Sequence, residues 1–91
     1  MTTLTRSALI TCKLIGTSQI RGSELRAALV DYGINESGPA FYKRMNNLEC
    51  SGMVMVIPEQ ELIDGNVIKF NNYKLTERGL LNAQITMNPF S

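Results

Sequence analysis

Hydrophobic residues recur at helical spacing through the first half of the chain. Over residues 4–15, apolar side chains repeat with a period of about 3.6 residues, and Thr3 or Thr5 can cap the start of the helix that this predicts. Gly16 and the polar residues that follow end the pattern. Ile20 is then expected to lie in a short extended link at most.

A second helix is predicted from Ser23, whose hydroxyl can cap its first turn. Its apolar residues fall at positions i, i+3, i+4 and i+7 and form a one-sided stripe: Leu25, Ala28, Leu29 and Tyr32. Gly33 supplies the left-handed stop, and Ile34 can close this end with a hydrophobic contact.

A short turn leads to the third helix. The sequence GINESGP, residues 33–39, is rich in turn-forming residues, and Pro39 suits the first turn of a helix. A further apolar stripe follows, with Gly52 as the stop: Phe41, Met45 and Leu48. Two helices joined by a short turn predict a helix-turn-helix unit.

After Gly52 the pattern changes to that of β-strands. Residues 53–57 and 67–75 predict an antiparallel hairpin, with residues 58–66 as a polar loop that contains the turn signal Asp64-Gly65-Asn66. The alternation in the second strand is imperfect, and a bulge near Asn71 and Asn72 would reconcile its two halves.

Thr76 can cap a last helix that continues to about Ile85. The order of helix, helix, helix, hairpin and helix predicts an α+β fold that is mainly α, a winged helix-turn-helix. It comprises a three-helix core, a two-stranded wing at about residues 53–75 and a short C-terminal helix. Residues 1–91 are expected to form a single domain.

Composition supports a globular chain and excludes several classes of protein. Hydrophobic residues make up 44% and charged residues 19% of the 91 residues, and the net charge is +1. The chain has no apolar run long enough to span a membrane, and its N-terminus is interpreted as a helix and not a signal peptide. We therefore expect a cytoplasmic protein without membrane contact.

The residues for common catalytic and metal sites are missing. The chain has no histidine, no CxxC pair and no phosphate-binding or nucleophile motif, so neither an enzyme nor a cofactor or zinc site is expected. Cys12 and Cys50 lie in apolar helical patterns and are interpreted as two reduced, buried thiols, with a structural disulfide as the alternative.

Two sequence elements resemble the PadR-like branch of winged-helix transcriptional regulators. The recognition helix of that family follows the pattern GpxxYxxLxxLexxGxV, matched here at Gly38, Pro39, Tyr42, Met45, Leu48, Glu49, Gly52 and Val54. The family closes its wing with YxLTxxG, matched at Tyr73, Leu75, Thr76 and Gly79. The resemblance extends from about Leu4 to Gly79, and it implies double-stranded DNA as the partner.

The chain also departs from this pattern. Phe41 and Met45 replace leucines, and Arg44 stands where an apolar residue is common, without an evident role in packing or in DNA contact. Members of the family usually continue into longer C-terminal helices. Only a short piece of these follows the wing here, so a large ligand-binding dimer core is not expected, and the effector is unknown.

The outward face of the third helix carries the residues expected to contact DNA. Lysine and asparagine can pair with base edges, and serine and tyrosine can reach phosphates. We expect this role for Ser37, Tyr42, Lys43, Asn46 and Asn47. Free backbone N–H groups at the helix start, near Gly38, Pro39 and Ala40, are also expected to face a phosphate. The alternative is an ordinary solvated face.

Phosphate contacts are also predicted from outside the third helix. Arg21, Ser23 and Arg26 lie at the start of the second helix, which crosses the DNA backbone in this motif, and Lys69 is a candidate from the wing. The predicted wing tip is acidic, with Glu59, Glu61 and Asp64, so it is not expected to enter the minor groove and is a candidate for meeting a protein.

Association remains a further expectation. The last helix and the residues after it carry much apolar surface for a chain end, including Leu81, Ile85, Met87 and Phe90. Such surface favours a homodimer formed through the first helix and the C-terminal tail. The second interpretation of the whole chain is a winged-helix protein-interaction module with little or no DNA binding, which its near-neutral charge also suits.

Overall fold

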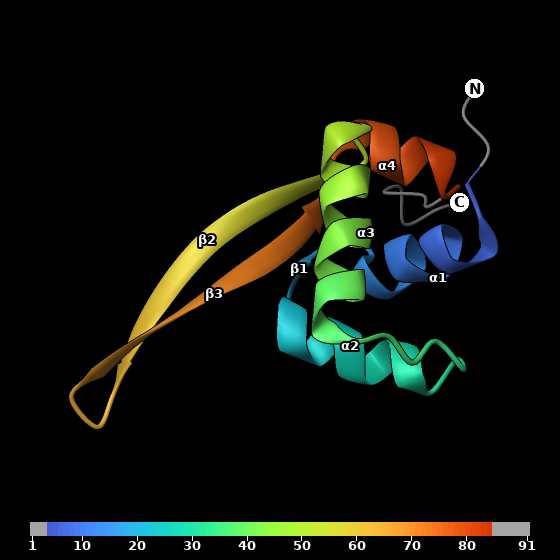
Figure 1. The fold of residues 1–91 in the computed structure, drawn as a ribbon. Helices are drawn as coiled ribbons and strands as arrows, with labels where there is room; N and C mark the ends of the chain where they lie inside the picture. The colour runs from blue at the N-terminus through green and yellow to red at the C-terminus, as the bar shows by residue number, and fades with distance from the viewer. Residues whose placement is uncertain (1–3, 85–91) are drawn as a thin grey trace.

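The structure is a computed structural model that describes residues 4–84. Within them, four helices and three strands follow one another in this order: α1 (Arg6–Ile15), β1 (Gln19–Arg21), α2 (Gly22–Val30), α3 (Gly38–Cys50), β2 (Val54–Ile63), β3 (Asn66–Leu75) and α4 (Glu77–Asn82). The helices gather into one body, and the hairpin of β2 and β3 projects from it as a long wing (Figure 1). The α+β winged helix-turn-helix is therefore confirmed.

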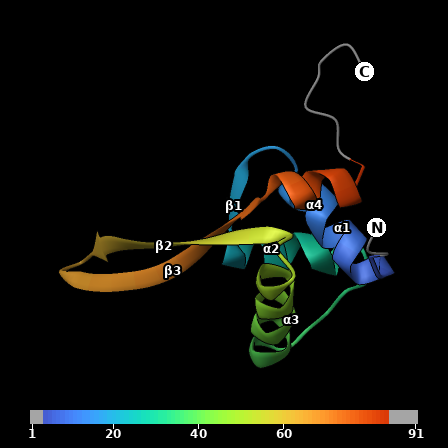
Figure 2. The same ribbon diagram turned by 90° about the horizontal axis from the view of Figure 1, so that it is seen from above.

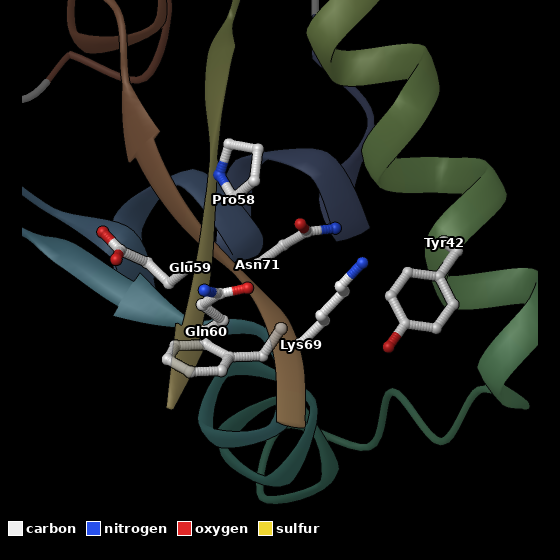
Figure 3. Close-up of a pocket in the computed structure, with 7 residues that line it drawn as sticks. Tyr42, Pro58, Glu59, Gln60, Lys69 and Asn71 are labelled. Atoms are coloured by element: carbon white, nitrogen blue, oxygen red, sulfur yellow. The ribbon is translucent and has the colours of Figure 1, made fainter. Parts of the chain in front are cut away.

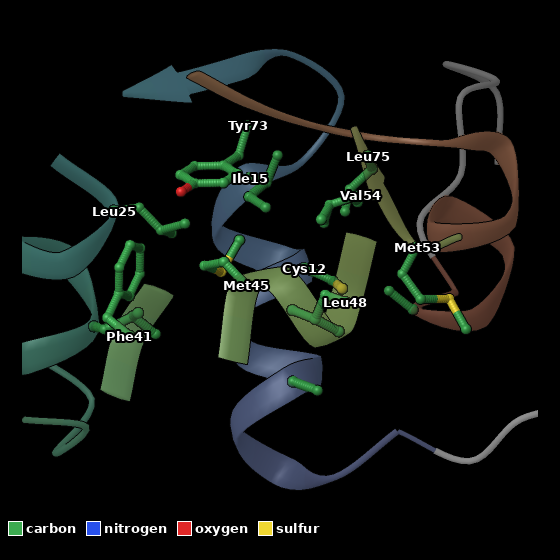
Figure 4. Close-up of a cluster of buried hydrophobic side chains, with 13 residues drawn as sticks. Cys12, Ile15, Leu25, Phe41, Met45, Leu48, Met53, Val54, Tyr73 and Leu75 are labelled. Carbon is green, nitrogen blue, oxygen red and sulfur yellow. The ribbon is translucent and has the colours of Figure 1, made fainter. Parts of the chain in front are cut away.

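The apolar stripes of the first three helices meet in a single core. Its fully buried side chains include Cys12 of α1, Leu25 and Leu29 of α2, and Phe41 and Met45 of α3. Tyr73 of β3 lies against Phe41, with ring centroids 6.1 Å apart, and closes the core from the sheet side (Figure 4). Tyr32 does not belong to this core. It follows the end of α2, and 52% of its surface is exposed.

The caps of the first two helices differ. Thr5 caps α1 by accepting a hydrogen bond from the Ala8 amide at 3.2 Å, as predicted. The N-cap of α2 is Arg21, which makes no side-chain capping bond, and Ser23 is already inside the helix. The prediction that Ser23 caps α2 is therefore wrong, because β1 runs directly into the helix. Gly33 adopts the expected left-handed conformation after α2, with φ of 79°.

The sheet has three strands, one more than predicted, in the order β1-β3-β2. Residues 19–21 form β1 and pair antiparallel with residues 72–74 of β3. Three residues are too few to give a strand pattern in the sequence. They become a strand because the edge of β3 offers backbone partners there.

The wing spans the predicted residues, but its strands are longer and pair more regularly than predicted. The pairing of β2 with β3 is continuous from Val54 opposite Leu75 to Ile63 opposite Asn66, so no bulge interrupts it. Residues predicted as a polar loop extend β2 through Pro58, and only Asp64 and Gly65 form the turn. Both have positive φ, of 50° and 79°, as a tight two-residue hairpin turn requires.

A junction of backbone and side-chain contacts joins the wing to α4. Thr76 caps α4 by accepting from the Gly79 amide at 3.0 Å, and its hydroxyl donates to the carbonyl oxygens of Gly52 and Met53. Gly79 packs so closely on Met53 that a Cβ would overlap its carbonyl oxygen. The two sequence elements that resemble the PadR-like family, one ending near Gly52 and one around Thr76, are thus in direct contact in the folded chain.

The helix α4 is shorter than predicted, since it ends at Asn82. Ala83, just after it, is buried, whereas 67% of the Leu81 surface is exposed. Ile85, Met87 and Phe90, which belong to the predicted dimer contact, lie outside the described residues. Within residues 4–84, no helix is long and apolar enough to cross a membrane.

Candidate nucleic-acid interface

The two faces of α3 divide as the sequence predicts. Phe41, Met45 and Leu48 are buried, with at most 7% of their surface exposed. The opposite side presents Tyr42, Lys43, Asn46 and Asn47 to solvent. A polar helix face that bears amide, ammonium and phenol groups can donate to and accept from base edges and phosphates.

The start of α3 is partly occupied by its own cap. Ser37 accepts a hydrogen bond from the Ala40 amide at 3.3 Å, and Pro39 in the first turn has no N–H to offer. The prediction of a free amide at Ala40 is therefore wrong, because the Ser37 hydroxyl takes it. Whether Ser37, Gly38, Pro39 and Ala40 contact a phosphate stays a prediction.

Arg44, which had no evident role in the sequence, bonds α3 to the turn before it and to α1. Its guanidinium donates to both carboxylate oxygens of Glu36, at 2.7 and 2.8 Å, and to the Thr11 hydroxyl at 2.6 Å. The bond from Arg44 holds the pKa of the Glu36 carboxyl below its usual range. These bonds connect the turn before α3 to α1. They take the place of the apolar packing that is common at position 44.

A second arginine holds the same turn. Arg26 of α2 donates to the backbone carbonyl of Glu36 at 3.0 Å, and its guanidinium lies 5.9 Å from the centre of the Phe41 ring. Glu36 is thus bound through its side chain by Arg44 and through its backbone by Arg26. The phosphate contact of Arg26 stays a prediction. In this structure its guanidinium is hydrogen-bonded to the turn before α3.

The wing has two chemically different faces, because side chains alternate along a strand. Its inner face consists of Pro58, Gln60, Leu62, Val67, Lys69 and Asn71, and its outer face of Ile57, Glu59, Glu61, Ile68, Phe70 and Asn72. The inner face continues the side that carries the buried residues Val54, Tyr73 and Leu75, so it is the face turned toward α3. Of its six residues, Lys69 is the charged one.

A cleft of about 620 Å³ lies between α3 and the inner face of the wing. Tyr42 lines it from the helix, and Pro58, Gln60, Lys69 and Asn71 line it from the wing, together with Glu59 and Phe70. Figure 3 shows the ammonium of Lys69 and the amide of Asn71 on the side of Tyr42, and the carboxylate of Glu59 directed away from it. A smaller hollow beside the cleft adds Ser23 from α2.

The predicted acidic wing tip is wrong. Glu59 and Glu61 belong to β2, and of the three acidic residues only Asp64 lies in the turn. The error follows from reading residues 58–66 as a loop. In a loop these side chains would gather at the tip, whereas in a strand they alternate and both glutamates fall on the outer face.

Arg21 does not lie free for a phosphate. Its guanidinium bonds to the Glu61 carboxylate at 3.0 Å and lies 3.8 Å from the centre of the Phe70 ring. The structure thus brings Ser23, Tyr42 and Lys69 together and holds Arg21 and Arg26 in internal contacts. Gln60 and Asn71 were missed in the sequence. Asn71 follows Lys69 by two residues, and Gln60 lies directly opposite Lys69 across the hairpin, so strand alternation and pairing could have identified both.

The two cysteines are free thiols in different surroundings. Cys12 is buried, and this burial raises the pKa of its thiol. Cys50 is exposed at the end of α3, so the prediction of a second buried thiol is wrong. The described residues contain no group of three or more His, Cys, Asp or Glu side chains that could hold a metal ion.

Comparison with solved structures identifies the fold. A PadR family transcriptional regulator from Eggerthella lenta matches with a TM-score of 0.64 and 21% identity over 85% of this chain and 64% of the other. Bacillus subtilis PadR in complex with operator DNA matches with a TM-score of 0.67 and 16% identity over 91% of this chain.

The fold is therefore a winged helix, and both neighbours carry the family name that the two sequence elements resemble. This chain spans 64% and 48% of the lengths of those two chains. No protein-family model and no curated protein matches the sequence.

Proposed function

We propose that this protein binds specific sites in double-stranded DNA and regulates transcription. The observation that carries the proposal is the exposed polar face of α3 beside an inner wing face without carboxylates, in the fold of PadR regulators. One of the two neighbours is a complex with operator DNA. The function requires no catalytic residue and no cofactor.

In the proposed complex, α3 enters the major groove. Tyr42, Lys43 and Asn46 face the bases, with Asn47 beside them, because all four project from the side of α3 that the core leaves free. Phosphates on one side meet the start of α3 at Ser37 and Gly38. A second backbone segment passes the cleft, where Ser23 and Lys69 are exposed.

The inner wing face is compatible with a phosphate backbone. A tip with three carboxylates would repel DNA, but the alternation of β2 places Glu59 and Glu61 on the outer face, and Arg21 offsets the charge of Glu61. Although the net charge is near zero, the carboxylates of β2 lie on the outer face of the wing and the ammonium of Lys69 lies on the inner face. A protein of this kind acts in the compartment that holds the DNA, which in a bacterial cell is the cytoplasm.

Binding-site selection from a random DNA library tests the proposal. We expect an enriched sequence, bound with an affinity that falls steeply with salt. The double change Lys43→Ala and Asn46→Ala should abolish the enrichment, and Lys74→Ala on the outer face of the hairpin is the control. Failure to enrich any sequence, or enrichment that the double change leaves intact, contradicts the proposal. Two half-sites in the selected sequence would support the homodimer that we propose through α1 and the C-terminal tail.

The second candidate function is a protein-interaction module. The observation that favours it is the apolar outer half of the wing, where Leu62 and Val67 expose 71% and 56% of their surface. Salt dependence separates the two functions, because an apolar protein interface responds weakly to salt, whereas a complex with several phosphates loses affinity steeply.

A further inference from the structure

Half of the wing extends beyond the sheet that anchors it. β1 pairs with residues 72–74 of β3, so beyond Asn72 the hairpin is a two-stranded ribbon that is exposed on both faces. An isolated ribbon of two strands twists freely and is marginally stable in water. The position of this outer half relative to α3 therefore depends on contacts outside the β ladder.

Arg21 supplies such a contact. It is the last residue of β1 and the N-cap of α2, so its backbone belongs to the rigid body. It pairs with Asn72, and its side chain runs outward over the same face of the ribbon. It passes Phe70, which lies on β3 two residues nearer the wing turn than Asn72. It then reaches Glu61 on β2, which lies opposite Ile68.

The contact combines two kinds of attraction. The guanidinium lies 3.8 Å from the centre of the Phe70 ring, close enough for a cation–π interaction, and donates to Glu61 at 3.0 Å. One side chain thus touches both strands of the ribbon. Within residues 4–84 there are two ion pairs, and this is the one between the body and the wing.

We propose that Arg21 is a positioning residue that fixes the angle between the wing and the recognition helix. It sets the width of the cleft between Tyr42 and Lys69, and so determines whether α3 and the wing can contact DNA together. The use of this role in DNA binding rests on the proposed function. The effect of Arg21 on the position of the wing does not depend on it. A wing held in place before binding avoids the entropy cost of ordering it in the complex.

The alternative role, a phosphate contact by Arg21, predicts the opposite effect of one substitution. If Arg21 binds phosphate, Glu61→Gln releases it and removes a repulsive charge, so DNA affinity rises. If Arg21 positions the wing, Glu61→Gln loosens the ribbon, so affinity falls although the protein becomes less acidic. The sign of the change therefore separates the two roles.

A distance measurement without DNA tests the structural part. Cys50 at the end of α3 is exposed and Cys12 is buried, so a spin label on Cys50 and a second on Asn66→Cys at the wing turn report the angle. We expect a narrow distance distribution in the parent chain and a broader or shifted one in Arg21→Ala and in Glu61→Gln. An unchanged distribution in both variants overturns the proposal.

Two matched controls accompany these variants. Glu59→Gln makes the same chemical change on the same strand and face, two residues away, at a side chain that forms no ion pair within residues 4–84. Arg6→Ala removes an exposed arginine from α1, a helix that lies away from the turn of the wing in Figure 1. Both should leave the distribution unchanged, and thermal unfolding confirms that every variant is folded.

The affinity for the selected DNA site tests the second part of the proposal, the effect of Arg21 on DNA binding. Arg21→Ala and Glu61→Gln should each lower it by about threefold to tenfold, with the salt slope unchanged. A slope reduced by about one in Arg21→Ala, with tighter binding by Glu61→Gln, overturns the proposal in favour of a phosphate contact. If no DNA is bound at all, the proposed function fails, while the distance measurement still decides whether Arg21 positions the wing.

Discussion

The half of the wing next to the body and the half beyond Asn72 are made of the same two strands, but different contacts hold them in place. Near the body, Val54, Tyr73 and Leu75 expose at most 4% of their surface and belong to the core. Eight residues along β2, Leu62 exposes 71%. Figure 2, turned from the first view, shows the same ribbon leave the helices and continue alone. Continuous backbone pairing therefore does not imply uniform stability.

The two ion pairs repeat this contrast. Glu36 and Arg44 lie in the body, with 19% and 18% of their side chains exposed, and two further protein groups accept from the arginine. Arg21 and Glu61 lie on the wing with 32% and 40% exposed. Water screens the second pair more strongly, so we expect the body pair to serve stability and the wing pair to serve orientation.

The largest effect is expected where the body is most tightly packed. Gly79→Ala should lower the free energy of unfolding by about 3 kcal/mol or more, because the new methyl group overlaps the Met53 carbonyl oxygen at the junction of the wing and α4. Denaturant unfolding measures the loss. Gly38→Ala is the control, since its Cβ would meet nothing closer than 3.7 Å. Equal effects would mean that the junction is not tightly packed.

The two halves of the wing can be compared with one substitution. Val54→Thr and Val67→Thr exchange side chains of the same shape on the same face, but Val54 is 2% and Val67 56% exposed. We expect a cost of about 1–3 kcal/mol for the first, because a buried hydroxyl loses its water, and less than about 0.5 kcal/mol for the second. Similar losses in chemical denaturation would show that the outer half also contributes to the core.

The ion pairs can be compared in the same way. Arg44→Ala leaves the Glu36 carboxylate without its partner inside the body and should cost about 1–3 kcal/mol. Arg21→Ala should cost less than about 1 kcal/mol, because its pair is more exposed to solvent than that of Arg44. Thermal unfolding of both variants, with Lys43→Ala on the exposed face of α3 as the control, measures the order. A reversed order would assign the wing pair to stability.

Acid should weaken the body through Glu36. Its pKa is lowered in the folded chain, so its contribution is present above the ordinary value of 4.5 and is lost as the pH falls through the lower folded value. The stability difference between the parent chain and Glu36→Gln should therefore be largest at neutral pH and shrink as the pH falls below 4.5. Urea unfolding across this range measures it. A difference that is independent of pH would mean that the carboxylate charge has no part in the clamp.

Local chemistry in the sequence was enough to predict the body. The spacing of Phe41, Met45 and Leu48 defines a buried face, and Thr5, Thr76, Gly33 and Gly52 mark helix ends, because caps and left-handed stops depend on residues close in the chain. The polar face of α3 follows directly as the side that the stripe leaves free. The fold and the exposed polar face of α3 could therefore be predicted without coordinates.

Tertiary structure alone decided the parts that depend on distant partners. A three-residue strand at Gln19–Arg21 exists because β3 pairs with it, and the polar residues after Pro58 extend a strand because β3 lies opposite. That pairing moved two glutamates from a supposed tip to the outer face. The folded chain also gave Arg21 and Arg44 carboxylate partners 40 and 8 residues away, a choice between internal and external contact that no local pattern encodes.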